Sequence, residues 1–469
     1  MRRALASSRY TFRLTLAHGE VLFNANTGAV IRFAGRDASE LAVRLSGPRT
    51  LIPRAALDKA LVARLERGGF LVDPDVDELT AIRRRYWEAR RNGPIVLLVT
   101  TTMDCNLGCY YCYESRSSHA LRVTDVGDVV ALARERLRRQ GKRSLHIDWY
   151  GGEPLMNVAF LESASLALQE LCRAEGIAYS ASVISNGTHW PDDVDHFVAR
   201  HKIRQVQISF DGLRAQHDRT RHYRPGYRPS SDGSSFDRAV RLVDRLLQAT
   251  RVDVRYNADP ANASDFAAFL DFAERRKWLD APFPCVVMVA KVSAYSERSA
   301  FMRRRELGGD QFAALEATAR DRLPPRAQDD PDVVAGFPHP KTSVCGALAF
   351  DSSVIGADGL EYRCGLQVGE RHRAVGRLMG DAPPSERFAD REWWERFDPT
   401  TLPTCSRCSF LPVCWGGCPK RHLEGSRPDI DSEGHFWRTN LPRMIAAGFG
   451  EQPPSGFAYT ETDQFREEH

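Results

Sequence analysis

The residues whose chemistry is easiest to predict in this sequence are its cysteines, because nine of the eleven fall into two groups. The first group is Cys105, Cys109 and Cys112, and the second holds six cysteines between Cys345 and Cys418. Thiolates are soft ligands for iron and zinc. The amino terminus has basic residues but no apolar stretch behind them, which argues against export and against a disulfide framework. The grouping therefore predicts metal binding in the cytoplasm.

The spacing of the first group suits one compact iron–sulfur cluster. Intervals of three and two residues let a single short loop place three thiolates around a 4Fe–4S cluster, which leaves one iron free to bind a substrate or cofactor. A structural zinc site needs a fourth ligand, and zinc or plain core cysteines are the alternatives. The loop directly follows the apolar run 95–100, which predicts a buried strand. Chemistry in a parallel sheet gathers at the carboxyl ends of strands.

The second group lies in a segment with little regular periodicity and many cysteine, glycine and proline residues. Its six cysteines are Cys345, Cys364, Cys405, Cys408, Cys414 and Cys418. Such a segment cannot build a large apolar core, so we expect metal to stabilise it. A zinc ribbon is the alternative, because Cys-x2-Cys pairs also suit zinc.

The elements that must position the first group begin at Pro94. The strand candidates are 95–100, 145–149, 180–184, 205–210, 253–257 and 285–289. They alternate with amphipathic segments at 124–140, 158–175, 190–200, 236–249 and 263–276. Repeated strand–helix units predict a parallel sheet with right-handed crossovers, either open or closed into a barrel.

The first 75 residues form a separate pattern. Strand-like runs at 10–16, 21–26 and 29–33 precede helical periodicity at 38–45 and 55–67. Strands followed by helices predict a winged-helix-like α+β domain. The charged stretch after it predicts a linking helix.

The first cysteine group, with an aromatic residue before its last member, resembles the radical S-adenosylmethionine (SAM) superfamily. Further short motifs follow in the order seen in that family: Gly151-Gly152-Glu153-Pro154, Ser185-Asn186, Ser209-Phe210-Asp211-Gly212, His217-Asp218 with Arg221, and Arg255 with Asn257. Each motif alone is weak, but each follows a successive strand candidate. The resemblance implies an α/β fold with a partial (β/α)6 TIM-like barrel.

The resemblance also implies roles for individual residues. Cys105, Cys109 and Cys112 would hold the catalytic cluster. Glu153, with its neighbouring glycines and Pro154, would meet the amino group of SAM. Ser185 and Asn186 would lie near the ribose. Other expected SAM-binding residues are Tyr111 against the adenine, Ser209 and Arg221 at the carboxylate, Asp211, and Arg255.

The second cysteine group resembles the SPASM extension of radical SAM enzymes, which carries two auxiliary 4Fe–4S clusters. The wiring of that extension implies that Cys345, Cys364 and Cys418 serve an inner cluster. It assigns the other three cysteines to an outer cluster. The family has one more cysteine beyond the last of these, and this chain has none. His435 lies near the expected spacing and is the first candidate for a replacement ligand, with Asp429 and Asp431 as alternatives.

The expected domains combine these patterns. They are a peptide-recognition-like winged-helix domain at 1–75, a linker helix at 76–93, a radical SAM core at 94–294, a bridge or insertion at 295–340, an irregular SPASM iron–sulfur domain at 341–440 and a C-terminal tail at 441–469. We expect the tail to be disordered after Gly450. The net charge of +4 is small and scattered, and no run of apolar residues is long enough for a membrane span. Neither nucleic acid nor a membrane is an expected partner.

The function implied by the resemblance is maturation of a ribosomally made peptide. The enzyme would cleave SAM reductively, abstract a hydrogen atom from a precursor peptide bound through its leader, and form a thioether or carbon–carbon crosslink. Its electron donor would be a flavodoxin or ferredoxin. One alternative is sulfatase-maturase-like oxidation of a protein Cys or Ser to formylglycine. The other is a non-catalytic, zinc-stabilised binding protein.

Overall fold

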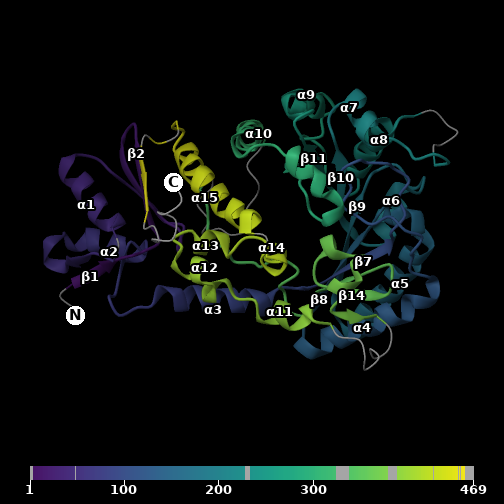
Figure 1. Ribbon diagram of the computed structural model, residues 1–469, viewed down its shortest axis with the longest axis horizontal. Helices are drawn as coiled ribbons and strands as arrows, with labels where there is room; N and C mark the ends of the chain where they lie inside the picture. Colours follow the sequence, from purple (N-terminus) through teal and green to yellow (C-terminus); the bar gives the residue numbers. More distant parts are fainter. Residues whose placement is uncertain are drawn as a thin grey trace. The chain divides into compact units, whose positions relative to one another are not determined.

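The computed structural model describes residues 4–47, 49–227, 233–323, 337–378, 388–425, 427–452, 454 and 456–459. The chain divides into two compact units, which are described separately (Figure 1). Unit 1 contains residues 1–92, 325–345 and 396–469, and unit 2 contains residues 93–324 and 346–395. The segment 341–440, expected as one domain, is therefore shared between the units.

Unit 2 is built on six parallel strands. They are β7 (Ile95–Thr102), β8 (Ser144–Gly151), β9 (Ala178–Ser185), β10 (Ile203–Phe210), β11 (Arg251–Ala258) and β12 (Cys285–Lys291), and they lie side by side in chain order (Figure 1). Side chains on alternate positions fill the core, as Ile95, Leu97 and Val99 do in β7. The α/β fold predicted from the repeated strand–helix pattern is confirmed.

Helices connect these strands and bury the apolar faces that their periodicity indicates. They are α4 (Val126–Gln140), α5 (Val158–Glu175), α6 (Val194–Arg200), α7 (Arg214–Thr220), α8 (Ser235–Leu246) and α9 (Phe266–Arg275), with short 3-10 turns η2 (Val123–Asp125), η3 (Pro154–Asn157) and η4 (Ala263–Asp265). In α8 the apolar residues from Phe236 to Leu246 face the core at helical spacing. The strand ends are thereby fixed to a rigid scaffold.

The segment after β12 is more regular than its sequence suggested. A 3-10 helix, η5 (Glu297–Arg304), leads into the helix α10 (Gly309–Arg322), which lies against β12 and α9. The expected bridge or insertion at 295–340 therefore contains regular helices in its described part. Its weak amphipathic pattern hid the helix, because only Ala313 and Leu315 are buried.

Part of the second cysteine region continues the sheet of unit 2. β13 (Ser353–Ile355) pairs in parallel with β7, and β14 (Leu360–Tyr362) and β15 (Gly376–Arg377) extend the sheet to nine strands among the described residues. The short helices here are η6 (Gly365–Gln367), η7 (Arg371–Arg373) and α11 (Asp390–Arg396). The buried Arg136 on α4 bonds to Glu361 on β14 at 2.8 Å, which ties this extension to the barrel.

Unit 1 contains two small antiparallel sheets. β1 (Ala4–Ser7) lies between β5 (Leu51–Pro53) and β6 (Leu71–Val72), and the second sheet contains β2 (Thr11–Leu16), β3 (Gly19–Asn24) and β4 (Val30–Phe33). The helices are α1 (Arg36–Ser46), η1 (Arg54–Ala56) and α2 (Lys59–Arg67). The sequence analysis missed β1 and β5, because runs of three or four residues carry little periodicity.

The carboxyl-terminal part of the chain is ordered within unit 1. α15 (Arg427–Gly448) is a long helix, and β16 (Gly456–Ala458) pairs with β2 at the edge of the second sheet (Figure 1). Phe457 stacks on Phe12 with ring centroids 5.7 Å apart. The expectation of disorder after Gly450 is wrong for residues 456–459, and residues 460–469 lie outside the described part of the chain.

The expected linking helix is α3 (Glu78–Asn92), and it packs against the chain that follows α11. Tyr86 and Arg90 both donate hydrogen bonds to the Phe397 carbonyl, at 2.7 and 2.8 Å. Beyond it lie η8 (Pro399–Thr401), α12 (Pro403–Arg407), α13 (Leu411–Cys414) and α14 (Pro419–Glu424). No helix within the described residues is long and apolar enough to cross a membrane.

Candidate active site and cysteine groups

The first cysteine group occupies the loop that leaves the carboxyl end of β7. Cys105 is buried, and Cys109 and Cys112 are partly buried. Burial raises the pKa of Cys105 to about 12, and the nearby Cys109 thiolate adds to this effect. Burial likewise raises the pKa of Cys112 to about 11, with contributions from Glu114 and Cys109. The three thiols therefore lie close enough to interact, and binding a metal would release their protons.

A short segment after α7 braces this loop, and the sequence analysis did not identify it. Gly108 donates a backbone hydrogen bond to the His222 carbonyl at 2.8 Å. Arg224 and Tyr227 both bond to Asp104, the residue before the first cysteine, at 2.6 and 2.5 Å. Hydrogen bonds from residues 222–227 thus fix the position of the cysteine loop. The spacing of the cysteines gives no sign of these partners, which lie more than a hundred residues further along the chain.

The two glycines after β8 lie against the backbone of the cysteine loop. A Cβ atom on Gly151, whose φ is +142°, would come within 2.3 Å of the Thr102 carbonyl oxygen. A Cβ on Gly152 would come equally close to the carbonyl oxygen of Asp104, at 2.3 Å. Glycine is required here because the end of β8 and the start of the loop touch through their backbones.

Glu153 joins the ends of two strands. Its buried carboxylate accepts hydrogen bonds from the Ser185 hydroxyl at 2.9 Å and from the Asn186 backbone N–H at 2.7 Å. Burial raises the pKa of Glu153 to about 7, against the lowering effect of these bonds. Pro154 begins η3 directly after it. The carboxylate therefore holds the loops after β8 and β9 together, apart from any contact that it makes with a ligand.

Asn186 connects this cluster of motifs to a cysteine sulfur. Its Nδ2 lies 3.7 Å from Cys105 Sγ, within hydrogen-bonding distance for sulfur, and 2.8 Å from the Asn106 side-chain oxygen. Its own oxygen accepts from Thr188. Asn186 is therefore held with its amide N–H directed at the cysteine loop.

The remaining predicted SAM-binding residues meet at the ends of β10 and β11. The Tyr111 hydroxyl donates to Asp211 at 2.8 Å, and Arg221 donates to the same hydroxyl at 2.8 Å. Burial raises the pKa of Asp211, and the neighbouring Arg221 opposes that rise. Ser209 and Arg255 are register partners on adjacent strands. The structure thus brings the residues of four motifs to one edge of the sheet.

A second buried network lies beside the last cysteine of the loop, and the sequence analysis missed it. The hydroxyls of Tyr113 and Tyr150 form a short hydrogen bond. Burial raises the pKa of the Glu114 carboxyl, which also accepts a hydrogen bond from Tyr150. Tyr295 packs edge-on against Tyr113, with ring centroids 5.6 Å apart. Aromatic residues and a carboxyl thus line the side of the loop that faces the end of β8.

The second cysteine group is divided between the units. Cys345 and Cys418 belong to unit 1, and the Cys345 thiolate contributes to the raised pKa of Cys418, which is caused chiefly by burial. Cys364 belongs to unit 2 and precedes η6. Within unit 1, Cys405, Cys408 and Cys414 line one cavity of about 60 Å³. Burial raises the pKa of Cys405 to about 12, with contributions from the other two thiolates.

The replacement-ligand candidates lie on α15. Asp431 lines the cavity together with the three cysteines, and its neighbours there include Ile430, Gly434 and Arg438. His435 is exposed and is not among the residues that line the cavity, and its Nε2 lies 3.4 Å from the Thr439 hydroxyl. The side chain of Asp429 lies outside the described part of the structure. The geometry therefore favours Asp431 over the histidine that the sequence spacing had favoured.

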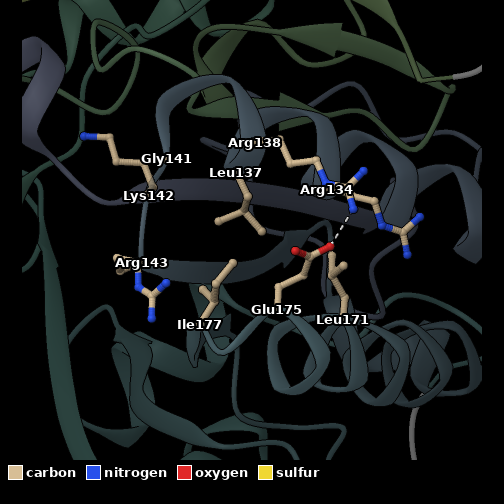
Figure 2. A pocket seen from close by; sticks show the side chains of 9 residues that line it. All are labelled: Arg134, Leu137, Arg138, Gly141, Lys142, Arg143, Leu171, Glu175 and Ile177. Carbon is tan, nitrogen blue, oxygen red and sulfur yellow. Dashed lines mark hydrogen bonds and ion pairs between the residues drawn. The ribbon is translucent and has the colours of Figure 1, made fainter.

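Unit 2 has another cavity, of about 190 Å³, at the opposite edge of the sheet from the cysteine loop (Figure 2). It is lined by Arg134, Leu137, Arg138, Gly141, Lys142, Arg143, Leu171, Glu175 and Ile177. Arg138 pairs with Glu175 across it at 2.8 Å. These residues come from the carboxyl-terminal parts of α4 and α5 and from the turns that lead into β8 and β9. They therefore do not belong to the site at the carboxyl ends of the strands.

Within the described residues, no three His, Cys, Asp or Glu side chains converge on one point where a single metal ion could bind. A cluster of several irons places its ligands on separate corners. The chemistry of the donor set fits such a cluster: one buried and two partly buried thiols lie on one loop, with an amide N–H directed at one sulfur.

Fold and site together define an α/β-barrel protein with a three-cysteine ligand loop at the carboxyl ends of its parallel strands. Comparisons name the family: residues 99–273 match the model of the radical SAM superfamily. This segment is a radical SAM domain, and the chain is an enzyme of radical SAM type whose cofactors are SAM and a 4Fe–4S cluster. That result favours catalysis over the alternative of a zinc-stabilised binding protein.

The similar proteins are maturases. The serine-type anaerobic sulfatase-maturating enzyme of Klebsiella aerogenes is 27% identical over 345 residues, which are 69% of this chain and 78% of that enzyme. The mycofactocin maturase MftC of Mycolicibacterium smegmatis is 24% identical over 361 residues, 71% of this chain and 80% of MftC. The structure of native anSMEcpe with bound AdoMet covers 76% of this chain and 100% of its own, with 17% identity and a TM-score of 0.55, which shows a shared fold.

Proposed function

We propose that this enzyme is a radical SAM peptide maturase that crosslinks a ribosomally made precursor peptide through a thioether or a carbon–carbon bond. When bound and reduced by a flavodoxin or ferredoxin, the cofactors supply a 5′-deoxyadenosyl radical that abstracts a hydrogen atom from the peptide. We assign the binding of the catalytic cluster to Cys105, Cys109 and Cys112. Auxiliary clusters held by the second cysteine group would accept an electron or bind the substrate.

In this proposal the chain's own residues orient SAM and exclude water. Glu153 and the backbone beside it would meet the amino group, while Ser209 and Arg221 would hold the carboxylate. The bonds from Tyr111, Arg221 and Asn257 hold the buried Asp211 in place, so this edge of the sheet is organised before a ligand binds. Pre-organised polar groups limit the reorganisation needed during a reaction.

The observation that supports a peptide substrate is an open strand edge in unit 1. The second sheet has the order β16-β2-β3-β4, so β16 covers one edge, while β4 pairs on one side only among the described strands. A leader peptide can add to such an edge as a further strand. We propose that residues 1–75 with β4 at their edge bind the leader.

The register identifies which backbone groups of β4 are available. Asn24 donates to the Ala29 carbonyl at 2.9 Å. Bonded pairs alternate along an antiparallel ladder, so Leu22 and Ile31 form the next bonded pair. The N–H and C=O groups of Val30 and Arg32 therefore face away from β3. These are the groups to which a leader strand would bond.

The test is a proline at Val30. Val30→Pro removes an outward-facing donor without removing a donor from the β3–β4 ladder, so we expect leader affinity to fall about tenfold or more. SAM cleavage without peptide should persist. Val30→Ala is the matched control, because it shortens the same side chain and keeps the N–H. Leader binding is measured by fluorescence anisotropy with a labelled synthetic leader, and equal affinities for the two variants would contradict the proposed edge.

Cofactor chemistry is checked separately from leader binding. The triple variant Cys105→Ala, Cys109→Ala, Cys112→Ala should lose one cluster of roughly three and all 5′-deoxyadenosine formation. Continued formation of 5′-deoxyadenosine by this variant would refute the assignment of the catalytic cluster.

A second candidate function is oxidation of a protein Cys or Ser to formylglycine. It is favoured by the similarity to the sulfatase-maturating enzyme over 69% of this chain. Formylglycine carries an aldehyde, which reacts with a hydrazide probe, whereas a crosslinked peptide does not. Tandem mass spectrometry of a crosslinked product shows instead a ring that resists fragmentation. Incubating the enzyme with each substrate class, followed by both readouts, therefore distinguishes the two functions.

A further inference from the structure

Three cysteines supply ligands for only three corners of a four-iron cluster, and the cavity in unit 1 offers one more group. Cys405, Cys408 and Cys414 come from the short helices α12 and α13 and the turn between them, and Asp431 comes from α15. These four side chains line the same cavity. From this juxtaposition we infer that Asp431 is the fourth ligand of the outer auxiliary cluster, through a carboxylate oxygen. The inference rests on the proposed role of the three cysteines as cluster ligands.

The face of α15 that borders the cavity includes Asp431 and does not include His435. Ile430, Gly434 and Arg438 recur at intervals of four residues and form one stripe on the helix. Asp431 lies beside this stripe. His435 lies a further step around the helix and is not among the residues that line the cavity, and its Nε2 lies 3.4 Å from the Thr439 hydroxyl. Both side chains are exposed, so their place on the helix distinguishes them.

Space and charge in the cavity both suit a short anionic ligand. A Cβ atom on Gly434 would come within 2.9 Å of Arg438 Nη1, so the glycine lets the guanidinium lie close to the helix beside the cavity. Arg438 lowers the pKa of Cys408, which burial raises overall. A cationic guanidinium beside three thiolates and a carboxylate reduces the mutual repulsion of four anionic ligands. A carboxylate is a harder donor than a thiolate, but it binds iron in many protein sites.

The experiment uses the full chain in the Cys105/Cys109/Cys112→Ala background, where only auxiliary clusters remain. Asp431→Ala should lose one iron of the outer cluster and show the electron paramagnetic resonance signal of an oxidised three-iron cluster. Asp431→Cys should keep all its iron, with a spectrum shifted towards that of all-thiolate ligation. Matched controls are His435→Ala and Asp429→Ala, which should leave iron content and spectrum unchanged.

Each outcome of this experiment bears on the inference. Full iron and an unchanged spectrum in Asp431→Ala would overturn it, as would loss of iron in either control instead. If Asp431→Ala fails to fold, as judged by circular dichroism, Asp431→Cys decides, because an unshifted spectrum in that folded variant also overturns the inference. The variant Cys405→Ala, Cys408→Ala, Cys414→Ala distinguishes a wrong assignment of Asp431 from the absence of the outer cluster itself. Undiminished iron there would refute the cluster itself, without any peptide being needed.

Discussion

Asn186 is the residue at which the motifs predicted to bind SAM and the cysteine loop meet. Its amide group is fixed by Asn106 and Thr188, and it places an N–H 3.7 Å from Cys105 Sγ. Hydrogen bonds to ligand sulfurs raise the reduction potential of an iron–sulfur cluster, because they stabilise the added negative charge. Asn186, which resembles a SAM contact in the sequence, can thus also set the reduction potential of a cluster bound to this loop.

Changing Asn186 to Ala should therefore make the potential of the catalytic cluster more negative. It should also slow reductive SAM cleavage when a weak reductant is used, and dithionite should partly restore the rate. A redox titration followed by electron paramagnetic resonance measures the shift. Asn157→Ala is the control, because that amide bonds to the Thr101 and Leu121 carbonyls instead. Equal potentials in wild type and Asn186→Ala would show that the contact has no electronic role.

At the scale of elements, the hairpin of β13 and β14 depends on one buried charge. Arg136 on α4 is 2.8 Å from Glu361 on β14 and 3.9 Å from Asp351, and all three side chains are less than a tenth exposed. Removing one partner of a buried ion pair leaves an uncompensated charge in a medium of low polarity. The attachment of this extension to the barrel should therefore be sensitive to Arg136.

Arg136→Met should lower the free energy of unfolding by about 3–5 kcal/mol, because the buried Glu361 carboxylate loses its cation, although Asp351 keeps its pair with Arg139. Urea unfolding followed by fluorescence measures this change. Arg138→Met is the matched control on the same helix, since its pair with Glu175 is largely exposed and such pairs contribute about 0–1 kcal/mol. Similar losses in both variants would mean that the burial of Arg136 is unimportant.

At the scale of the whole molecule, stability should depend on pH through buried histidines. Burial lowers the pKa of His201, at the end of α6, and that of His217 on α7 falls well below its usual value for the same reason. In the unfolded chain these histidines become protonated near pH 6.5, whereas in the folded chain they become protonated only at lower pH. Unfolding is therefore favoured as the pH falls through and below 6.5.

These two histidines should lower the urea midpoint between pH 7 and pH 5.5, whereas the raised pKa of Glu153, about 7, stabilises the folded chain over the same range. His201→Leu should therefore raise the midpoint at pH 5.5 relative to that at pH 7, compared with the wild type. Each unit by which a histidine pKa is depressed is equivalent to about 1.4 kcal/mol. The control is His119→Leu, because that histidine is exposed and its hydrogen bond to Ser117 is local. The same difference between the pH 7 and pH 5.5 midpoints in His201→Leu as in the wild type would contradict the assignment.

The sequence by itself determined the features that depend on neighbouring residues. Six strands and five helical segments between them, the three-cysteine loop after the first of these strands, and the order of the motifs at later strand ends all follow from local periodicity and short spacings. Parallel strands bring their carboxyl ends to one edge, so the meeting of Cys105, Glu153, Asn186, Asp211 and Arg221 in one region could be predicted without coordinates.

Only the tertiary structure decided the features that depend on pairing between distant segments. The bracing of Asp104 by Arg224 and Tyr227, the pairing of β16 with β2, and the presence of Asp431 rather than His435 at the cavity wall have no signature in local pattern. Spacing from Cys418 pointed to His435, but the direction of a side chain on α15 depends on where the helix lies against the cysteines. That placement is set by packing across the whole of unit 1, which no short stretch of the chain encodes.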